Sequence, residues 1–122
     1  MAAINLDTAA RLDITCRKGD TFQLEIDFEQ SIPTATWLMH VRETDTSEED
    51  ENIIIPEDDI TFAVADNSSG VTNALLTVTI ADSVMAEVQS GTYVYDIQND
   101  SVNVTKTYVF GLFKVNEDVT TP

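Results

Sequence analysis

The chain has 122 residues, an apolar fraction of 43%, and 22 acidic against 6 basic side chains, which gives a net charge of −16. This length suits one domain that folds without a disulfide or a metal, and the acidity excludes direct binding to nucleic acid or to an anionic membrane, because both are themselves anionic. A basic partner, cations and simple solubility remain compatible with the charge.

The single cysteine and the absence of long apolar runs limit the cellular compartments in which we expect this chain. Cys16 has no second thiol with which to form an intrachain disulfide, and its place in an alternating run indicates a small core residue. A lone thiol suits synthesis in a reducing compartment. No apolar run approaches the ~20 residues that cross a bilayer, and residues 1–7 lack the basic and apolar regions of a signal peptide. We therefore expect a soluble chain that is not exported by such a peptide.

Turn-forming residues divide the chain into short alternating runs. Residues 1–11 are polar and alanine-rich and predict an N-terminal arm, residues 12–116 a β-sandwich domain, and residues 117–122 a C-terminal tail. Residues 43–51 are acidic or small and polar, and predict an extended, mobile loop because like charges repel. Seven or eight strands are expected, over residues 12–16, 21–29, 36–42, 52–55, 60–65, 71–80, 91–98 and 102–115.

Alternation in these runs assigns one face of each strand to the core. The side chains expected to point inward are Phe22, Leu24, Ile26, Phe28, Trp37, Met39, Val41, Ile60, Phe62, Val64, Leu76, Val78 and Ile80. We expect Trp37 to be a core anchor and not a surface binding residue, because a lone tryptophan in a sandwich strand is usually buried. One short helix is expected over residues 82–88, with Asp82 as its N-cap and an apolar edge of Val84 and Val88.

The centre of the predicted sandwich is a hairpin. Residues 91–98 form a strand that begins at Gly91, residues 99–101 form a turn, and residues 102–115 form the return strand. The return run is too long for one flat strand, and we expect Gly111 to mark a bulge or bend in it.

The number and spacing of the strands predict an all-β fold, an antiparallel β-sandwich with immunoglobulin-like or jelly-roll topology. The segment Gly91-x-Tyr93-x-Tyr95 favours the immunoglobulin-like form. It is similar to the corner before strand F of immunoglobulin-like domains, where a tyrosine hydroxyl bonds back to the preceding backbone, and we expect Tyr93 in that role. The disulfide that is common in those domains is absent, because Cys16 is the only cysteine.

Three segments in this order carry a resemblance to a known group of proteins. They are residues 12–22 (LDITCRKGDTF), 91–98 (GTYVYDIQ) and 107–120 (TYVFGLFKVNEDVT), and together they cover about a quarter of the chain. The set resembles small β-sandwich proteins encoded in the structural gene blocks of tailed bacteriophages. Within that group it is most similar to the immunoglobulin-like N-terminal domain of baseplate and tail-fibre adaptor proteins.

The resemblance implies a role in assembly. The chain is then expected to be a non-enzymatic structural protein of a phage virion, an accessory module of the capsid, neck or tail. Its partners would be other virion proteins, bound in multiple symmetric copies. It would be made in the host cytoplasm and located in the virion, and its negative charge would keep free copies soluble before they dock.

The residues themselves suggest no catalytic or cofactor site. His40 stands opposite the predicted core face of its strand, with no nucleophile paired to it by motif. The sequence has no cysteine pair or second histidine for zinc, and no glycine-rich phosphate loop. Calcium is the one cofactor to weigh, and neither acidic loop that could bind it has EF-hand spacing. Its candidate ligands are Asp45, Glu48, Glu49, Asp50 and Glu51 in one loop and Glu57, Asp58 and Asp59 in the other.

Two other functions stand beside this expectation. A carbohydrate- or host-surface-binding module would present exposed aromatic rings, whereas the candidate rings lie in predicted strands: Trp37, Tyr93, Tyr95 and Tyr108. An enzyme is disfavoured, because the sequence shows no constellation of reactive groups.

Overall fold

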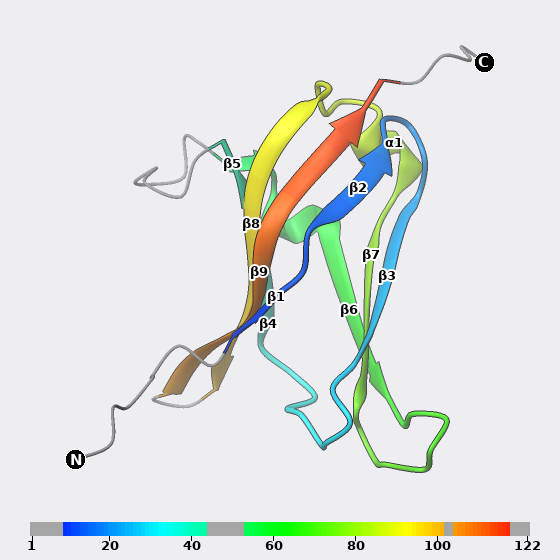
Figure 1. Cartoon of the computed structure of the whole chain (residues 1–122), viewed down its shortest axis with the longest axis vertical. Helices are drawn as coiled ribbons and strands as arrows, with labels where there is room; N and C mark the ends of the chain where they lie inside the picture. Colours follow the sequence, from blue (N-terminus) through cyan, green and yellow to red (C-terminus); the bar gives the residue numbers. More distant parts are fainter. Residues whose placement is uncertain (1–8, 44–52, 102–103, 118–122) are drawn as a thin grey trace.

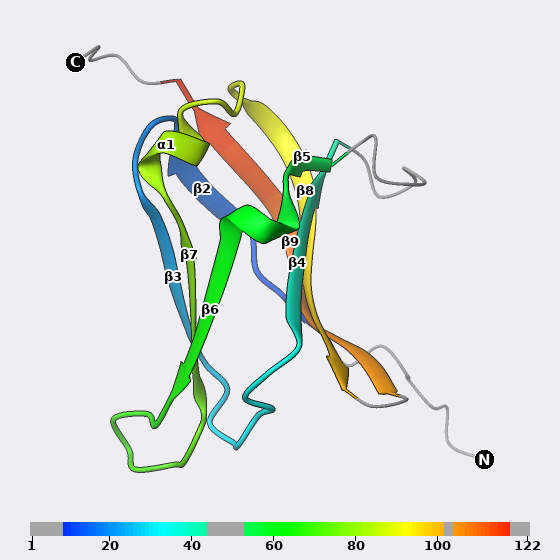
Figure 2. The same cartoon turned by 180° about the vertical axis from the view of Figure 1, so that it is seen from behind.

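The computed structural model describes residues 9–43, 53–101 and 104–117, which form two β-sheets packed face to face (Figure 1; Figure 2). One sheet has six strands, in the order β1–β9–β8–β4–β5 with β2 also paired to β9, and the other has three, in the order β3–β7–β6. The strands are β1 (Ala10–Arg11), β2 (Ile14–Arg17), β3 (Phe22–Asp27), β4 (Trp37–Arg42), β5 (Ile53–Ile55), β6 (Ile60–Ala65), β7 (Leu75–Ile80), β8 (Gly91–Ser101) and β9 (Val104–Asn116). Two short helical segments connect them, η2 (Glu57–Asp59) and α1 (Asp82–Met85).

The strand order is that of an immunoglobulin-like sandwich. Strands β4, β8 and β9 lie in one sheet and β3, β7 and β6 in the other, as strands C, F, G and B, E, D do in that fold. Strand β5 extends the first sheet beyond β4, as an additional strand does in variable-type domains. The predicted antiparallel β-sandwich is confirmed, in its immunoglobulin-like form. Strands β1 and β2 depart from the antiparallel rule, because each pairs in parallel with β9.

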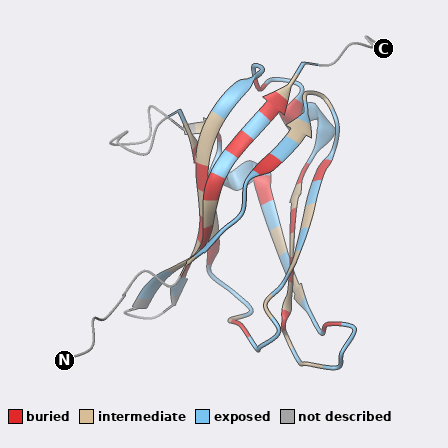
Figure 3. Cartoon of the chain, viewed as in Figure 1, coloured by how far each residue is buried: buried red, intermediate tan, exposed pale blue. Residues whose placement is uncertain are grey.

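The core lies between the two sheets and is built by alternation along the strands (Figure 3). The inward faces predicted for β3, β4, β6 and β7 are confirmed. The inward side chains of the central strand β7 are fully buried, whereas in the edge strands β3 and β6 some inward side chains are half-buried: Leu24, Ile26, Phe62 and Val64.

Trp37 is a core anchor, as expected. Its ring packs against Phe28 and Tyr108, with centroid separations of 6.2 and 5.0 Å. Its indole N–H donates a hydrogen bond of 2.8 Å to the carbonyl oxygen of Pro33. The one polar group of the side chain is therefore satisfied inside the core, and only 6% of the residue is exposed.

The first strand of the central hairpin is longer than predicted. The turn expected at residues 99–101 is wrong, because β8 continues through them to Ser101. Asn99 is buried, and its side-chain amide donates a hydrogen bond of 2.7 Å to the carbonyl oxygen of Ala35. A polar residue with turn preference is thus held in the strand by a long-range partner, which sequence composition does not reveal.

The bulge in the return strand lies at a different residue from the one predicted. The register of β8 with β9 shifts between Ile97 and Gln98, which leaves Tyr108 as the extra residue. A bulge or a bend was expected at Gly111, and the bulge is wrong, because Gly111 pairs in register with Tyr95. The bulge allows Tyr108 and the next residue to pack on the core together.

The N-terminal part of the domain begins earlier than predicted. Residues 10 and 11 were assigned to the arm, and they form β1, where Ala10 pairs with Val109 and Arg11 with Phe110. The strand expected from Leu12 begins at Ile14, because residues 12–13 connect β1 to β2. The remainder of the predicted arm, residues 1–8, and the predicted tail after Glu117 lie outside the described residues.

The predicted helix is shorter in the structure and is capped differently. Ala81 is its N-cap and makes no side-chain capping bond, so the cap expected at Asp82 is wrong. Met85 and Val88 are buried beneath it, whereas Val84 is half-buried. Among the helices of the described residues, none combines the length and the apolar character that a membrane crossing needs.

Candidate binding face

The outer face of the six-stranded sheet brings basic and apolar side chains together. Strand pairing arranges these side chains in rows that cross the sheet. Two such rows are His40–Asp96–Phe110–Arg11 and Arg42–Val94–Leu112. Adjacent strands lie ~4.8 Å apart, so the first row spans ~14 Å from β4 to β1.

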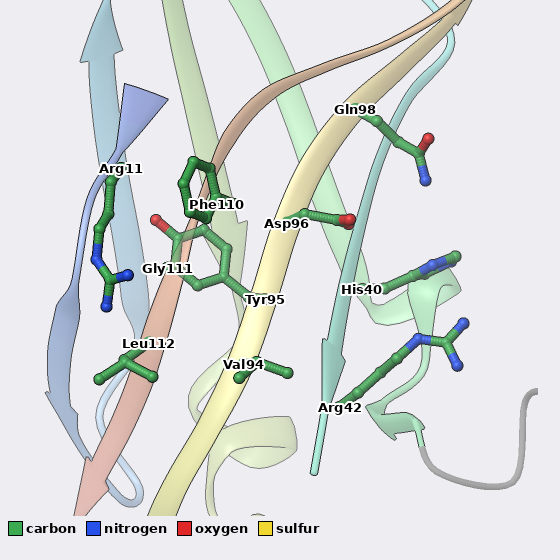
Figure 4. A pocket seen from close by; sticks show the side chains of 10 residues that line it. All are labelled: Arg11, His40, Arg42, Val94, Tyr95, Asp96, Gln98, Phe110, Gly111 and Leu112. Carbon is green, nitrogen blue, oxygen red and sulfur yellow. The ribbon is translucent and has the colours of Figure 1, made fainter. Parts of the chain in front are cut away.

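These rows line an open groove of about 460 Å³ on the outer face (Figure 4). Its apolar lining comes from Val94, Phe110 and Leu112. Arg11 lies at the β1 side of the groove, and His40 and Arg42 extend from β4 at the other side. The groove therefore combines an apolar surface with charged groups at both sides.

Each charged group of the groove is influenced by a neighbour. Burial raises the pKa of the Asp96 carboxyl above its ordinary value, and the positive charges of His40 and Arg42 oppose that shift. The Nε2 atom of His40 lies 2.9 Å from a carboxylate oxygen of Glu57. The Nε atom of Arg11 lies 3.3 Å from the carboxylate of Asp13. Partly exposed pairs of this kind contribute little to stability, so a docking partner can replace them at small cost.

The connection between β1 and β2 is held by three hydrogen bonds, two to β9 and one to β8. The N–H of Leu12 donates to the carbonyl oxygen of Phe110 over 2.8 Å, and the Tyr95 hydroxyl donates to the carbonyl oxygen of Leu12. The Asp13 carboxylate accepts from the N–H of Leu112 over 3.0 Å. Burial, and then the charge of Asp13, raise the pKa of Tyr95, so its hydroxyl stays a donor at neutral pH. Because Arg11 directly precedes this connection, these bonds hold Arg11 in place at the β1 side of the groove.

Gly111 permits this close approach of two backbones. A Cβ atom at residue 111 would overlap the carbonyl group of Leu12 and lie 2.9 Å from Oδ1 of Asp13. Any side chain at this position would push the connection away from β9. Gly111 therefore has a structural role, although not the role expected from the sequence.

The start of β8 contains the tyrosine corner. The Tyr93 hydroxyl donates a hydrogen bond of 2.6 Å to the carbonyl oxygen of Gln89, as expected for this residue. Gly91 lies beside the ring, and a Cβ there would be an ordinary 3.5 Å from the hydroxyl oxygen. Tyr95 occupies the position that holds the second cysteine in disulfide-bonded immunoglobulin domains, two residues after the corner tyrosine. The Tyr95 hydroxyl therefore connects β8 to the distant residue Leu12 through a hydrogen bond at this position.

Three of the calcium candidates lie in the part of the chain that the structure describes. Asp58 and Asp59 are exposed in η2 with Glu57. The candidates outside the described residues are Asp45, Glu48, Glu49, Asp50 and Glu51. Among the residues that the structure describes, no group of three histidine, cysteine or acidic side chains is placed to hold a metal ion.

Cys16 is half-buried and packs against the core from β2. Its thiol donates a weak hydrogen bond of 3.5 Å to the carbonyl oxygen of Lys114. Burial, and then the negative charge of Asp20, raise the pKa of the Cys16 thiol to about 11. The side chain is therefore a packed, protonated thiol at neutral pH.

Sequence reasoning singled out His40 but missed Arg11 and Arg42 as surface groups of one site. The signal for Arg42 was present, because alternation in residues 36–42 places it on the same outward face as His40. The signal for Arg11 was absent, because it depends on the parallel pairing of β1 with β9 across about a hundred residues of chain.

Comparisons with known proteins give no family. No family model matches the chain, and no curated protein matches it. Among solved structures, the chain is similar to one described as the three-dimensional structure of the NK cell receptor Nkp44, a triggering partner in natural cytotoxicity. The two sequences are 17% identical, the match covers 89% of this chain and 99% of that chain, and the TM-score is 0.38. The immunoglobulin-like assignment rests on the strand order and on the Tyr93 corner.

Proposed function

We propose that this chain is a non-enzymatic structural protein of a tailed-phage virion, which binds other virion proteins through the outer face of its six-stranded sheet. The observation that carries the proposal is the groove on that face, with an apolar lining flanked by Arg11 and Arg42. Elsewhere the net charge of −16 opposes close contact with other acidic proteins. A partly apolar surface of mixed charge has the composition of a protein–protein contact.

The phage assignment draws support from where the three resembling segments lie. Residues 12–22 include β2, residues 91–98 lie in β8, and residues 107–120 include most of β9. Strands β2, β9 and β8 are consecutive neighbours in the six-stranded sheet. The resemblance therefore concerns one continuous layer of the molecule, the layer that carries the groove.

Symmetric assembly would allow a small binding face to attach the protein firmly to a virion. The groove is shallow and its exposed apolar area is small, so a single contact would be weak. Several copies on a symmetric particle add their contacts, and the effective concentration of each copy rises once its neighbours are bound.

The test is the composition of purified virions from the phage that encodes this chain. We expect the protein at a fixed copy number, small for a neck or tail position and in the hundreds for a capsid position. Leu112→Asp should lower incorporation, because Leu112 is 38% exposed on the binding face. Ala63→Asp adds the same charge on the outer face of the other sheet and is the matched control. Virions that lack the wild-type protein would contradict the proposal.

A carbohydrate- or host-surface-binding module is the second proposal, and the ring of Phe110 is the observation that favours it. This ring lies in the groove beside polar side chains that could bond sugar hydroxyls, among them Asp96 and Gln98. Of the other candidate rings, Trp37 is in the core and Tyr95 is 4% exposed, whereas Tyr93 and Tyr108 are half-buried, as Phe110 is, but do not line the groove. A glycan-array signal that disappears in Phe110→Ala would favour this proposal over the first.

A further inference from the structure

The three-stranded sheet has an open edge at β3. Within the described residues β3 pairs with β7 alone. At its end the N–H of Phe28 donates to the carbonyl oxygen of Ala74 over 2.9 Å. Bonded pairs alternate along an antiparallel ladder, so the even-numbered residues of β3 bond to β7. The backbone groups of Gln23, Glu25 and Asp27 consequently point to the open edge.

Two kinds of side chain alternate along this edge. The outward side chains of Gln23, Glu25 and Asp27 are exposed, and strands β3, β6 and β7 contain no lysine or arginine. The inward side chains of Leu24 and Ile26 are half-buried, although the inward residues of β7 beside them are fully buried. An additional strand beside β3 would cover these apolar side chains and bond the outward backbone groups.

The charges at the edge select the occupant. If two copies paired through β3, the acidic side chains of a chain with net charge −16 would face one another, and like charges placed opposite are destabilising. A segment with lysine or arginine on its outward side would instead pair with Glu25, whereas the Asp27 carboxylate already accepts hydrogen bonds from the N–H of Glu29 and the side-chain amide of Asn67. The other edge strand, β6, lacks this selectivity, because its outward side chains are the uncharged Thr61, Ala63 and Ala65.

We propose that the β3 edge binds an extended basic segment of another protein, in which lysine or arginine alternates with apolar residues, as a fourth strand of this sheet. Main-chain hydrogen bonds would supply affinity, and the alternating side chains would supply selectivity. The inference deepens the proposed function by naming the chemistry of one partner, and it rests on that function only in taking the chain to be a protein-binding module.

The test uses the full chain and a synthetic peptide that alternates lysine and valine over the length of β3. Amide hydrogen exchange followed by NMR should show the N–H groups of Gln23 and Glu25 slowed about tenfold or more on saturation with peptide. The N–H groups of Leu24 and Ile26, already bonded to β7, should change little. A peptide that alternates glutamate and valine should give no protection, and a lysine–valine peptide with a central proline should bind more weakly.

A charge-reversal pair of variants tests the selectivity. Glu25→Lys should weaken binding of the lysine–valine peptide by about tenfold, because it places like charges opposite each other. Glu43→Lys makes the same change of charge at the end of β4 in the other sheet and should leave affinity nearly unchanged.

The proposal is overturned if Glu25→Lys binds the peptide as tightly as the wild type, or if protection appears along β6 in place of β3. Protection of Gln23 and Glu25 in the free chain that grows with its own concentration would assign the edge to a second copy and would also overturn it. Protection by the peptide together with absence of the protein from virions would refute the proposed function and leave this inference standing.

Discussion

The two sheets of this sandwich differ in the regularity of their strand pairing and in the charge that they carry. The pairings of β3 and β6 with β7 keep one register throughout, and these three strands carry two acidic side chains and no basic one. The six-stranded sheet contains two register shifts, one between β8 and β9 and one between β4 and β5, and two parallel additions to β9. Its strands hold five of the six basic residues of the chain, which are Arg11, Arg17, Arg42, Lys106 and Lys114.

The two sheets therefore differ in how much they depend on particular residues. The regular sheet needs only alternation of apolar and small polar side chains, which local propensity supplies. The irregular sheet needs a glycine where two backbones approach closely, a Tyr93 hydroxyl bonded to the nearby backbone of Gln89, and a Tyr95 hydroxyl bonded to the distant backbone of Leu12. The position of Arg11 beside the groove depends on the contacts that Gly111 and Tyr95 make with Leu12, so we expect substitutions there to lower stability more than substitutions on the regular sheet.

The largest effect should come from Gly111→Ala. The new Cβ would overlap the Leu12 carbonyl, and we expect a loss of about 3 kcal/mol in the free energy of unfolding, measured by urea denaturation. Gly91→Ala is the matched control, because Gly91 has the same φ of 158° while a Cβ there meets only an ordinary contact. Equal losses in the two variants would show that the close approach at Gly111 is not what requires glycine.

The second prediction concerns the thiol in β2 of the irregular sheet. Because the pKa of Cys16 is raised from 9.0 to about 11, alkylation by iodoacetamide at pH 8 should be about a hundredfold slower in the folded chain than in urea. Similar rates in the two states would mean that β2 separates readily from β9.

The same pKa shift sets a stability change with pH. The folded chain holds the Cys16 proton more tightly than the unfolded chain, so the thiol contributes stability that is fully present below pH 9.0. That contribution is lost as the pH rises through about 11. Cys16→Ala should reduce this alkaline decrease in the free energy of unfolding, although the Tyr95 hydroxyl, whose pKa is also raised, will still contribute to it.

A smaller effect is expected from Tyr95→Phe. It removes the hydrogen bond to Leu12 and should lower the free energy of unfolding by about 1.5 kcal/mol. Tyr108→Phe is the control, because the structure gives the Tyr108 hydroxyl no hydrogen bond to a described residue. If the two variants lose the same stability, the Tyr95 hydroxyl does not hold the connection between β1 and β2 in place.

The smallest effect belongs to the regular sheet. Ala63→Thr, on the exposed face of β6 opposite Thr77, should raise the free energy of unfolding by about 0.3 kcal/mol through strand propensity and a cross-strand pair. A loss above about 1 kcal/mol would show that the two sheets are equally sensitive and would remove the contrast between them.

Much of the fold could be predicted from the sequence, because inward and outward faces follow from alternation within single strands. The buried row of Trp37, Met39 and Val41 is one case, and the corner bond of Tyr93 followed from a short local motif. What failed depends on contacts between distant residues. Asn99 stays in a strand because Ala35 accepts its bond, and Gly111 is needed because Leu12 passes over it.

The candidate site was harder to predict for the same reason. His40 was recognised as an outward residue, but the groove exists only when the rows of β4, β8, β9 and β1 align. Register between strands is set by packing and turns along the whole chain, so the alternation within single strands does not reveal it. The open edge of β3 likewise depends on where β2 goes, which is to β9.

The parallel attachment of β1 and β2 to β9 has a mechanical consequence. Because β1 and β2 run parallel to β9, residue 10 lies beside Val109 near the middle of β9, and the chain runs from there toward the end of β9 at Asn116 (Figure 1). A pulling force applied at residues 10 and 116 would load the hydrogen bonds of the β1–β9 and β2–β9 pairings in shear. These bonds would then have to break together and not one after another. We expect high resistance along this axis in single-molecule pulling, and low resistance when the force is applied across β3 and β7 so that they unzip.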